Sequence, residues 1–257
     1  MKNLLREKTA RGEQTVGSFL GMGGAGVAEC MALAGLDYCI IDTEHGPFDV
    51  ETAMDMIRAA ELNGMTPLVR VKDGKRNSVL KMLDVGAKGL IIPFLNSVEE
   101  MKEIISYGKY FPLGERGVAF GRGAGYGYAE HVKNGLEDYF RICNRETMLI
   151  PQCERVGCLE HIEEITALEG IDGIFVGPYD LSASMGIPGQ FDKPEFKEAV
   201  ARILKACKDH GKFSMIYCGN TEIAKMRLAQ GFDSATLACD YNILTEAYQA
   251  ARKAILG

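Results

Sequence analysis

The sequence lacks the features that mark membrane proteins, disulfide-rich secreted proteins and nucleic-acid-binding proteins. No apolar run approaches the roughly 18 residues of a membrane-spanning helix, and the charged stretch Met1–Lys8 has no apolar core of a signal peptide. The eight cysteines form no Cys-x-x-Cys pair, and four of them lie in or beside apolar, strand-like runs. We therefore expect buried, reduced thiols and a cytoplasmic location. The net charge of −6 and the isoelectric point near 5.4 argue against nucleic acid and anionic membranes as main partners.

The composition is that of a globular protein with an ample core. Apolar residues make up 47% and charged residues 25% of the 257 residues. A chain of this length can bury most of the surface that it exposes when unfolded. No shift in composition marks a linker, so we expect a single domain over residues 1–257.

Short apolar runs recur along the chain, with amphipathic stretches of helical period between most of them. The expected strands are Thr15–Leu20, Tyr38–Asp42, Pro67–Val71, Gly89–Pro93, Met148–Gln152, Gly173–Gly177, Phe213–Tyr217 and Ser234–Cys239. The expected helices are Val27–Ala34, Asp49–Leu62, Ser78–Asp84, Val98–Tyr107, Gly157–Leu168, Glu195–Asp209 and Thr221–Ala229. Strands that alternate with helices favour an α/β fold with a parallel sheet, and eight such units predict a (β/α)₈ TIM barrel.

Two segments fall outside this alternation. The stretch Phe94–Thr147 forms a long insertion after the fourth strand, and it contains the glycine-rich run Arg122–Gly127. Long loops in compact domains are usually functional or disordered, so this loop either reaches over a site or is a flexible surface segment. The last stretch, Leu244–Leu256, has one apolar face, which must cover either its own barrel or that of a neighbouring subunit.

The polar residues of the expected strands collect at the C-terminal ends. The run Tyr38–Asp42 ends in a carboxylate, and Glu44 and His45 follow directly. The ends of other strands add Arg70, Glu154 and Asp180. In a barrel these ends meet at one mouth. Four acids in a common space repel one another unless their pKa values rise or a cation binds, and oxygen ligands favour Mg²⁺ or Mn²⁺ over zinc.

Each of these residues also has a simpler interpretation. Glu154 and Asp180 end adjacent strands and can reach one ion, but each also precedes a helical stretch that it could cap, as Asp42 and Glu44 could cap the next helix. Arg70 lies in an apolar strand and needs an anionic partner, which is either a neighbouring carboxylate or an anionic substrate. Of the four histidines, only His45 lies beside a carboxylate cluster. The other three lie in charged stretches, which predicts that they are on the surface.

A glycine pattern suggests a different class of enzyme. Gly21, Gly23 and Gly26 satisfy G-x-G-x-x-G between an expected strand and helix, and Asp42 ends the next strand. This pattern is close to a dinucleotide-binding fingerprint and makes an NAD-dependent oxidoreductase an alternative. Eight strands without a substrate domain, and the acids at later strand ends, do not fit that layout.

Several motifs together resemble the HpcH/HpaI aldolase family, whose members include 4-hydroxy-2-oxoheptanedioate and 2-dehydro-3-deoxyglucarate aldolases. The match covers nearly the whole chain in order, which makes it more specific than any single motif. The motifs are Ile41–Pro47, Pro67–Val71, Leu83–Ala87, Arg116–Val118, Gln152–Glu154 and Gly173–Ser182.

The resemblance implies a class II, metal-dependent pyruvate aldolase that reversibly splits a 4-hydroxy-2-oxo acid into pyruvate and an aldehyde. It implies that Glu154 and Asp180 hold a divalent ion, Mg²⁺, Mn²⁺ or Co²⁺, which pyruvate chelates. It also implies that Arg70 contacts the keto oxygen and that Gln152 lines the substrate site. We expect Asp42 to be part of the substrate site as well, where it and Glu44 fix the metal's waters and the imidazole of His45.

The resemblance also implies a subunit arrangement. His45 would handle protons, and Asp84 of a neighbouring subunit would orient it. Members typically form homohexamers built from trimers, with the last helix exchanged between subunits.

Three residues depart from the pattern of the family. Phe19 stands where familiar members carry Trp, and this chain has no Trp at all. Tyr179 and Tyr217 stand where smaller or aliphatic residues are usual. All three would lie around the mouth, where the aldehyde enters, so the identity of the aldehyde acceptor stays open. A citrate-synthase-like or acyl-CoA-condensing activity, as in distant relatives, is the alternative.

Overall fold

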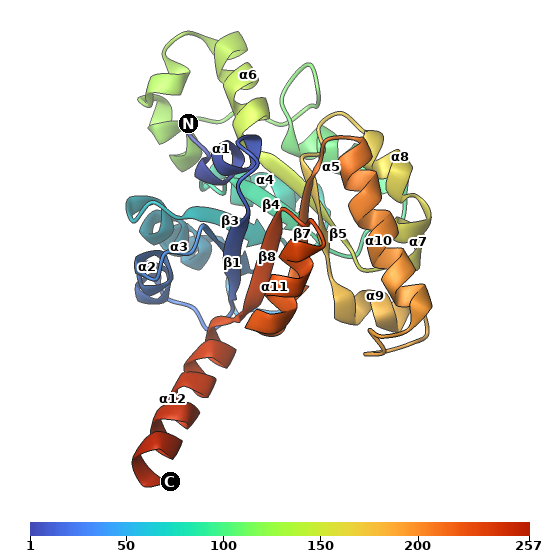
Figure 1. The fold of residues 1–257 in the computed structure, drawn as a ribbon. Coiled ribbons are helices and arrows are strands. Elements are labelled where there is room, and N and C mark those ends of the chain that lie inside the picture. Colours follow the sequence, from blue (N-terminus) through green and yellow to red (C-terminus); the bar gives the residue numbers. More distant parts are fainter.

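The computed structural model describes all residues 1–257 and contains a closed barrel of eight parallel strands (Figure 1). The strands pair in chain order, and β8 pairs with β1 to close the barrel. The (β/α)₈ prediction is therefore confirmed. The strands are β1 (Thr15–Leu20), β2 (Tyr38–Asp42), β3 (Thr66–Arg70), β4 (Gly89–Ile92), β5 (Met148–Cys153), β6 (Gly173–Val176), β7 (Phe213–Cys218) and β8 (Ser234–Cys239).

Helices follow every strand, and most of them pack around the barrel. None is long and apolar enough to cross a membrane. The α-helices are α1 (Leu4–Ala10), α2 (Ala25–Leu33), α3 (Val50–Leu62), α4 (Arg76–Asp84), α5 (Val98–Gly108), α6 (Leu136–Glu146), α7 (Val156–Glu160), α8 (Ile162–Ala167), α9 (Pro178–Ser184), α10 (Pro194–Asp209), α11 (Thr221–Ala229) and α12 (Asp240–Leu256). Two 3₁₀ helices, η1 (Arg122–Gly127) and η2 (Glu130–Val132), lie between α5 and α6.

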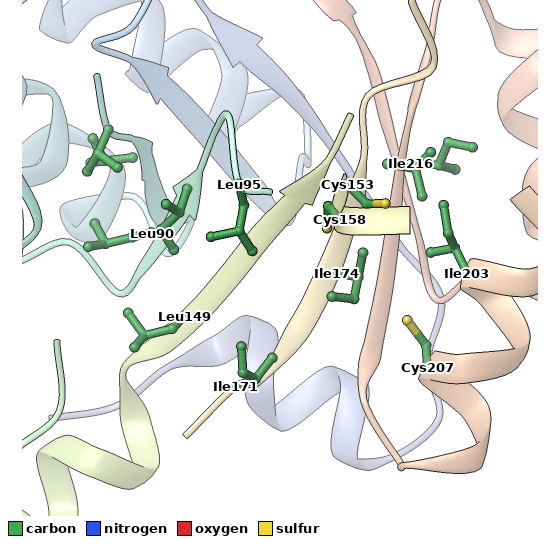
Figure 2. Close-up of a cluster of buried hydrophobic side chains, with 14 of the residues drawn as sticks. Leu90, Leu95, Leu149, Cys153, Cys158, Ile171, Ile174, Ile203, Cys207 and Ile216 are labelled. Carbon is green, nitrogen blue, oxygen red and sulfur yellow. The ribbon is translucent and has the colours of Figure 1, made fainter. Parts of the chain in front are cut away.

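The strands are mostly apolar because both of their faces are buried. Side chains such as Phe19, Phe175 and Met215 fill the inside of the barrel. Their alternate neighbours face the layer beneath the helices, where Ile174 and Ile216 pack with Ile203 of α10 (Figure 2). The only charged residues within the strands, Asp42 and Arg70, are each the last residue of their strand.

The N-terminal helix α1 closes one end of the barrel. Its Leu5 is fully buried and belongs to the same cluster as Leu68 and Met148 inside the barrel. The backbone amide of Leu5 donates to the hydroxyl of Thr66, at the start of β3. The barrel is thus plugged at the N-terminal ends of its strands, which leaves the C-terminal ends as the open mouth.

The insertion after β4 lies at the plugged end and not over the mouth. Figure 1 shows α6 beside α1 and the N-terminus. Arg122 of the glycine-rich run pairs with Glu61 and donates to the carbonyl of Val85, past the C-terminal end of α4. The interpretation of this run as a loop over its own chain's site is therefore wrong; local ion pairs anchor it instead.

The last helix projects away from the barrel (Figure 1). It begins at Asp240, four residues earlier than expected, and every residue after Asp240 is exposed. The helix does not cover its own barrel. Its exchange with another subunit stays a prediction.

Candidate active site

The best-defined polar contact at the mouth joins Arg70 to Asp42. These residues end neighbouring strands and lie opposite each other in the register of β2 and β3. Arg70 donates from Nε to Oδ1 of Asp42 at 2.9 Å and from Nη2 to Oδ2 at 2.6 Å. Burial alone would lower the pKa of Arg70, but Asp42, Glu44 and Glu154 together raise it above its ordinary value. Asp42 therefore fixes a permanent cation at the mouth, and Arg70 has a carboxylate partner within its own chain.

The residues after Asp42 form a turn rather than a helix cap. Asp42 accepts weak hydrogen bonds from the amides of Glu44 and His45, whereas the following helix α3 is capped by Asp49. The alternative interpretation, in which Asp42 or Glu44 caps the next helix, is thus wrong. Oε2 of Glu44 lies 3.3 Å from Nε of Arg70, but it is buried without a well-formed hydrogen bond.

His45 is the most accessible member of this turn. Its side chain is 72% exposed, and its Nε2 lies 3.9 Å from Oε2 of Glu44. Burial raises the pKa of Glu44, and the charges of Glu154 and Asp42 add to this increase against the opposing effect of Arg70. The imidazole is therefore free to meet a ligand at the open side of the mouth.

Glu154 is the most buried carboxylate at the mouth, at 4% exposure. Its Oε1 accepts from the amide of Phe94 at 2.6 Å, and its Oε2 accepts from Nε2 of Gln152. Burial is the main reason that the pKa of Glu154 is raised, and the nearby charge of Asp180 adds to it. The other amide atom of Gln152, Oε1, is buried with no partner.

Two backbone positions shape the surroundings of Glu154, and no motif indicated either role. Phe94 presents its amide from a left-handed conformation, with a φ of 63°. Gly177 has no side chain where a Cβ would lie 3.2 Å from Nε2 of Gln152 and 3.4 Å from Oε2 of Glu154. The glycine therefore keeps open the space beside the carboxylate.

Asp180 lies in the first turn of α9, exposed and without a hydrogen bond or ion pair to the rest of the chain. Gly177 occupies the cap position of α9, and Arg155 occupies that of α7. Neither Asp180 nor Glu154 is thus a helix N-cap. The two carboxylates act on each other electrostatically instead, as the pKa of Glu154 indicates.

An aromatic wall borders the mouth on the side of β7. The guanidinium of Arg70 lies 4.7 Å from the ring centre of Phe19. The ring of Tyr217 follows at 6.1 Å from Phe19, and that of Tyr179 at 6.0 Å from Tyr217. Burial raises the pKa of Tyr217 to about 12, so its hydroxyl stays protonated at neutral pH. The three residues that depart from the family pattern thus lie together.

Asp84 lies elsewhere in its own chain. It ends α4, and its Oδ1 accepts from Nη2 of Arg116 at 2.9 Å. Helices of a barrel run from the mouth toward the opposite end, so this carboxylate lies at the far end from His45. Contact between His45 and Asp84 of another subunit stays a prediction.

The glycine loop has a structural partner. The amides of Gly21 and Met22 donate to the carboxylate of Asp240 at 3.0 and 3.1 Å. Asp42 is likewise committed to Arg70. The first amides of the glycine pattern and its acid are therefore bonded within the protein, and the closed barrel replaces the two-half layout of the dinucleotide-binding fold.

The mouth has the donor set for a hard divalent cation. Three carboxylates, of Asp42, Glu44 and Glu154, act on one guanidinium, and Asp180 lies near enough to Glu154 to raise its pKa further. Burial raises the pKa values of Glu44 and Glu154. Such excess negative charge is relieved by a cation with oxygen ligands. No group of three or more His, Cys, Asp or Glu side chains forms a ready-made cage. The residues therefore fit an ion for which protein carboxylates supply only some of the ligands.

Comparison with known proteins agrees with this arrangement. The family model described as HpcH/HpaI aldolase/citrate lyase matches residues 16–247. The chain is 30% identical to 2-keto-3-deoxy-L-rhamnonate aldolase of Klebsiella pneumoniae, over 96% of this chain and 91% of that protein. It is 29% identical to hydroxypyruvate/pyruvate aldolase of Roseobacter denitrificans, over 94% and 93% of the two chains. The crystal structure of citrate synthase SbnG matches with a TM-score of 0.86 at 29% identity, over 97% of this chain and 96% of that one. The chain therefore belongs to the HpcH/HpaI aldolase/citrate lyase family.

Proposed function

We propose that the protein is a carbon–carbon lyase that reversibly cleaves a 4-hydroxy-2-oxo acid to pyruvate and an aldehyde. The observation that carries this proposal is the mouth, where a fixed guanidinium faces the buried carboxylate of Glu154. Two relatives that match almost the whole chain carry names of aldolases for 2-oxo acids. We also propose that residues 1–257 form one domain, because a single closed barrel takes its strands from Thr15 to Cys239.

Arg70 is the group best placed to bind the oxygen on which negative charge develops. Asp42 occupies its Nε and Nη2, and its Nη1 makes no hydrogen bond within the chain. A donor that is held in position before the substrate arrives stabilises such a charge without reorganisation. Arg70 would therefore bind the 2-oxo group and strengthen this contact as the bond between carbons 3 and 4 breaks.

Glu154 and Asp180 would hold a divalent cation, Mg²⁺ or Mn²⁺, which when bound supplies a Lewis acid for the 2-oxo acid. Gln152 orients Glu154 through its Nε2, and its unpartnered Oε1 leaves an acceptor for a ligand donor. Phe94 holds the second carboxylate oxygen. These contacts fix the carboxylate of Glu154 before the ion binds.

His45 is the candidate for proton transfer. Histidine is the most frequent general acid or base in enzymes, and the accessible ring of His45 lies beside Glu44. In the cleavage direction it would take the proton of the 4-hydroxyl group and return it in the condensation direction.

The test measures pyruvate release from a 4-hydroxy-2-oxo acid, with and without EDTA. We expect chelation to abolish release and Mg²⁺ or Mn²⁺ to restore it. Asp180→Asn should lose metal-dependent activity and keep the melting temperature of the metal-free protein, because Asp180 bonds to nothing within the chain. Full activity of the chelated protein would refute the metal requirement, and the absence of any cleavage would refute the lyase.

The second candidate is a condensation that forms citrate, which the match to a citrate synthase favours. Oxaloacetate with acetyl-CoA, and pyruvate with a panel of aldehydes, distinguish the two reactions. Release of free CoA with oxaloacetate, together with no product from pyruvate and any aldehyde, would favour the synthase.

We also propose that a second copy of the chain receives α12, in a homo-oligomer. Tyr248 and Ile255 of α12 are 71% and 80% exposed, although both are apolar. Figure 1 shows β1 and β8 without a covering helix between α2 and α11. Leu244→Asp and Tyr248→Asp should lower the mass measured by light scattering, whereas the exposed Gln249→Asp should not. An unchanged mass would refute the exchange.

A further inference from the structure

The turn that carries His45 is bonded to the barrel at its start and at no point along its later length. The carboxylate of Asp42 accepts from the amides of Glu44 and His45, at 3.2 and 3.3 Å. Beyond His45 the turn forms no hydrogen bond until Asp49, which caps α3. Because the imidazole is exposed, its position depends on the backbone that carries it.

The ring of Phe48 lies at the far end of this turn, between two glycines. A Cβ added to Gly46 would lie 3.1 Å from both Cδ2 and Cε2 of the ring. A Cβ added to Gly23 would lie 2.5 Å from Cε1 and 2.8 Å from Cζ. Opposite edges of the ring therefore face the turn itself and the loop after β1. The ring is partly buried and packs against the main hydrophobic core.

Both glycines are required where they stand. A Cβ at Gly46 would also approach the carbonyl oxygen of Asp42 to 2.1 Å. Gly23 has a φ of 93°, in the range that favours glycine. A side chain at either position would displace the ring of Phe48 or the backbone beside it. The central glycine of the G-x-G-x-x-G pattern thus makes room for an aromatic ring.

The loop after β1, against which the ring packs, is itself fixed to the start of α12. The amides of Gly21 and Met22 donate to the carboxylate of Asp240 at 3.0 and 3.1 Å. The ring of Tyr241 packs on Gly21, where a Cβ would lie 2.9 Å from its Cε1. Phe48 therefore packs against a loop that other contacts already hold in place.

We propose that Phe48 is a positioning residue for proton transfer by His45. Its ring, inserted between Gly23 and Gly46, fixes the turn against the loop after β1 and so sets where the imidazole stands relative to Arg70. The inference rests on the proposed lyase function and adds a residue that acts on the substrate only through His45. Misplacement of a reacting group by about 1 Å can cost about 100-fold in rate, so loss of this contact has a measurable effect.

Gly23→Ala and Gly24→Ala form a matched pair of variants. The two glycines have φ values of 93° and 98°, so alanine causes similar backbone strain at each position. Only at Gly23 would the Cβ meet the ring of Phe48, because a Cβ at Gly24 meets no atom within 4 Å. We expect Gly23→Ala to lower the kcat of cleavage by about 10- to 100-fold and Gly24→Ala to keep it within about twofold of wild type. Equal kcat values of the two variants would refute the inference.

A double-mutant cycle shows whether Gly23 acts through the ring. Phe48→Ala should lower the kcat of cleavage by a similar factor and leave KM unchanged, and Phe48→Leu should lower kcat less, because leucine keeps part of the apolar contact. Gly23→Ala added to Phe48→Ala should cause no further loss, because the ring that the Cβ would displace is already absent. Losses that multiply in the double variant would contradict the inference.

Decarboxylation of oxaloacetate separates positioning from general damage to the site. The bond between carbons 3 and 4 breaks, CO₂ leaves, and the electron pair remains as the pyruvate enolate, which then takes a proton from water. The enolate is the same as in cleavage, but no hydroxyl proton has to be removed. Phe48→Ala and Gly23→Ala should therefore keep the decarboxylation rate, measured above the rate with Mg²⁺ alone. An equal loss of both reactions would indicate general damage and overturn the inference.

Nuclear magnetic resonance tests the contact without turnover. The chain has four histidines, and His45→Gln identifies the imidazole signal of His45. Gly23→Ala and Phe48→Leu should shift this signal and leave the other three in place, whereas Gly24→Ala should shift none. An unmoved His45 signal would exclude the positioning role. Wild-type protein that shows the expected shift but cleaves no 4-hydroxy-2-oxo acid would refute the proposed lyase and still support the positioning of His45 by Phe48.

Discussion

Replacement of Arg70 by lysine tests whether the shape of the guanidinium, and not only its charge, is required. Arg70 holds Asp42 with two parallel hydrogen bonds and keeps Nη1 for a substrate. A lysine ammonium is a single point of charge and cannot make both contacts while it binds a third oxygen. We therefore expect Arg70→Lys to fold and to lose catalysis.

The loss can be estimated from the contact. Removal of one prepositioned donor to a developing oxyanion costs about 2.7–4 kcal/mol, or 10²- to 10³-fold in kcat. The Arg70 side chain is only 11% exposed, so solvent cannot replace the lost donor. The loss should appear in kcat more than in KM, because the contact strengthens as the charge develops.

Steady-state kinetics of pyruvate release provide the measurement, with the melting temperature as the check on folding. Arg58→Lys is the matched control, since Arg58 is exposed and makes one bond to Asp55 at 2.8 Å; it should change neither quantity. A kcat of Arg70→Lys within threefold of wild type would refute the role of the guanidinium.

Three further predictions follow from the same contacts. Glu154→Gln should raise the stability of the metal-free protein at neutral pH. The pKa of Glu154 is higher in the folded protein than its ordinary value of 4.5, so its ionisation destabilises the fold as the pH rises through that pKa. Urea denaturation at pH 7.5 and pH 4 checks this, and a gain in stability that persists at pH 4 would contradict it. Gly177→Ala should reduce kcat, because the added Cβ would displace Gln152 or Glu154. Gly26→Ala is the control and should leave kcat unchanged, because a Cβ there meets no atom within 4 Å. Equal activity of the two variants would exclude the role of Gly177. Asp240→Ala should lower the free energy of unfolding in urea by about 1–3 kcal/mol, because the amides of Gly21 and Met22 lose their acceptor. The control Asp192→Ala, at an exposed carboxylate, should leave the free energy of unfolding unchanged. Similar stability of the two variants would refute the anchoring role of Asp240.

The barrel was predictable because each of its strands is buried on both faces. Uninterrupted runs such as Tyr38–Asp42 could be placed to within a residue or two, and Pro67–Val71 was displaced by only one residue from β3. The family resemblance and the expected class of carbon–carbon lyase are confirmed by the family model and the named relatives. The position of polar groups at strand ends placed Arg70 and Glu154 together, because parallel strands end at one edge.

The rest depended on contacts between distant parts of the chain. Asp240 bonds to the amide of Gly21, 219 residues away, which no local pattern indicates. The left-handed conformation of Phe94 follows from the carboxylate that its amide meets, since phenylalanine has no intrinsic preference for it. The glycine-rich run at Arg122 suggested a loop over the mouth, but its anchor is Glu61 on α3. The composition of this run did not indicate which part of the chain it packs against.

The plug that Leu5 forms limits how substrates can enter the barrel and how products can leave it. Because one end is closed, the two products of the proposed cleavage share a single exit. Pyruvate would lie deep, between Arg70 and Glu154, and the aldehyde would lie outside it along the aromatic wall. The aldehyde must then leave first and enter last in the reverse direction. In the proposed reaction, the architecture of the fold would therefore set the order of product release, whatever the affinities of the two products.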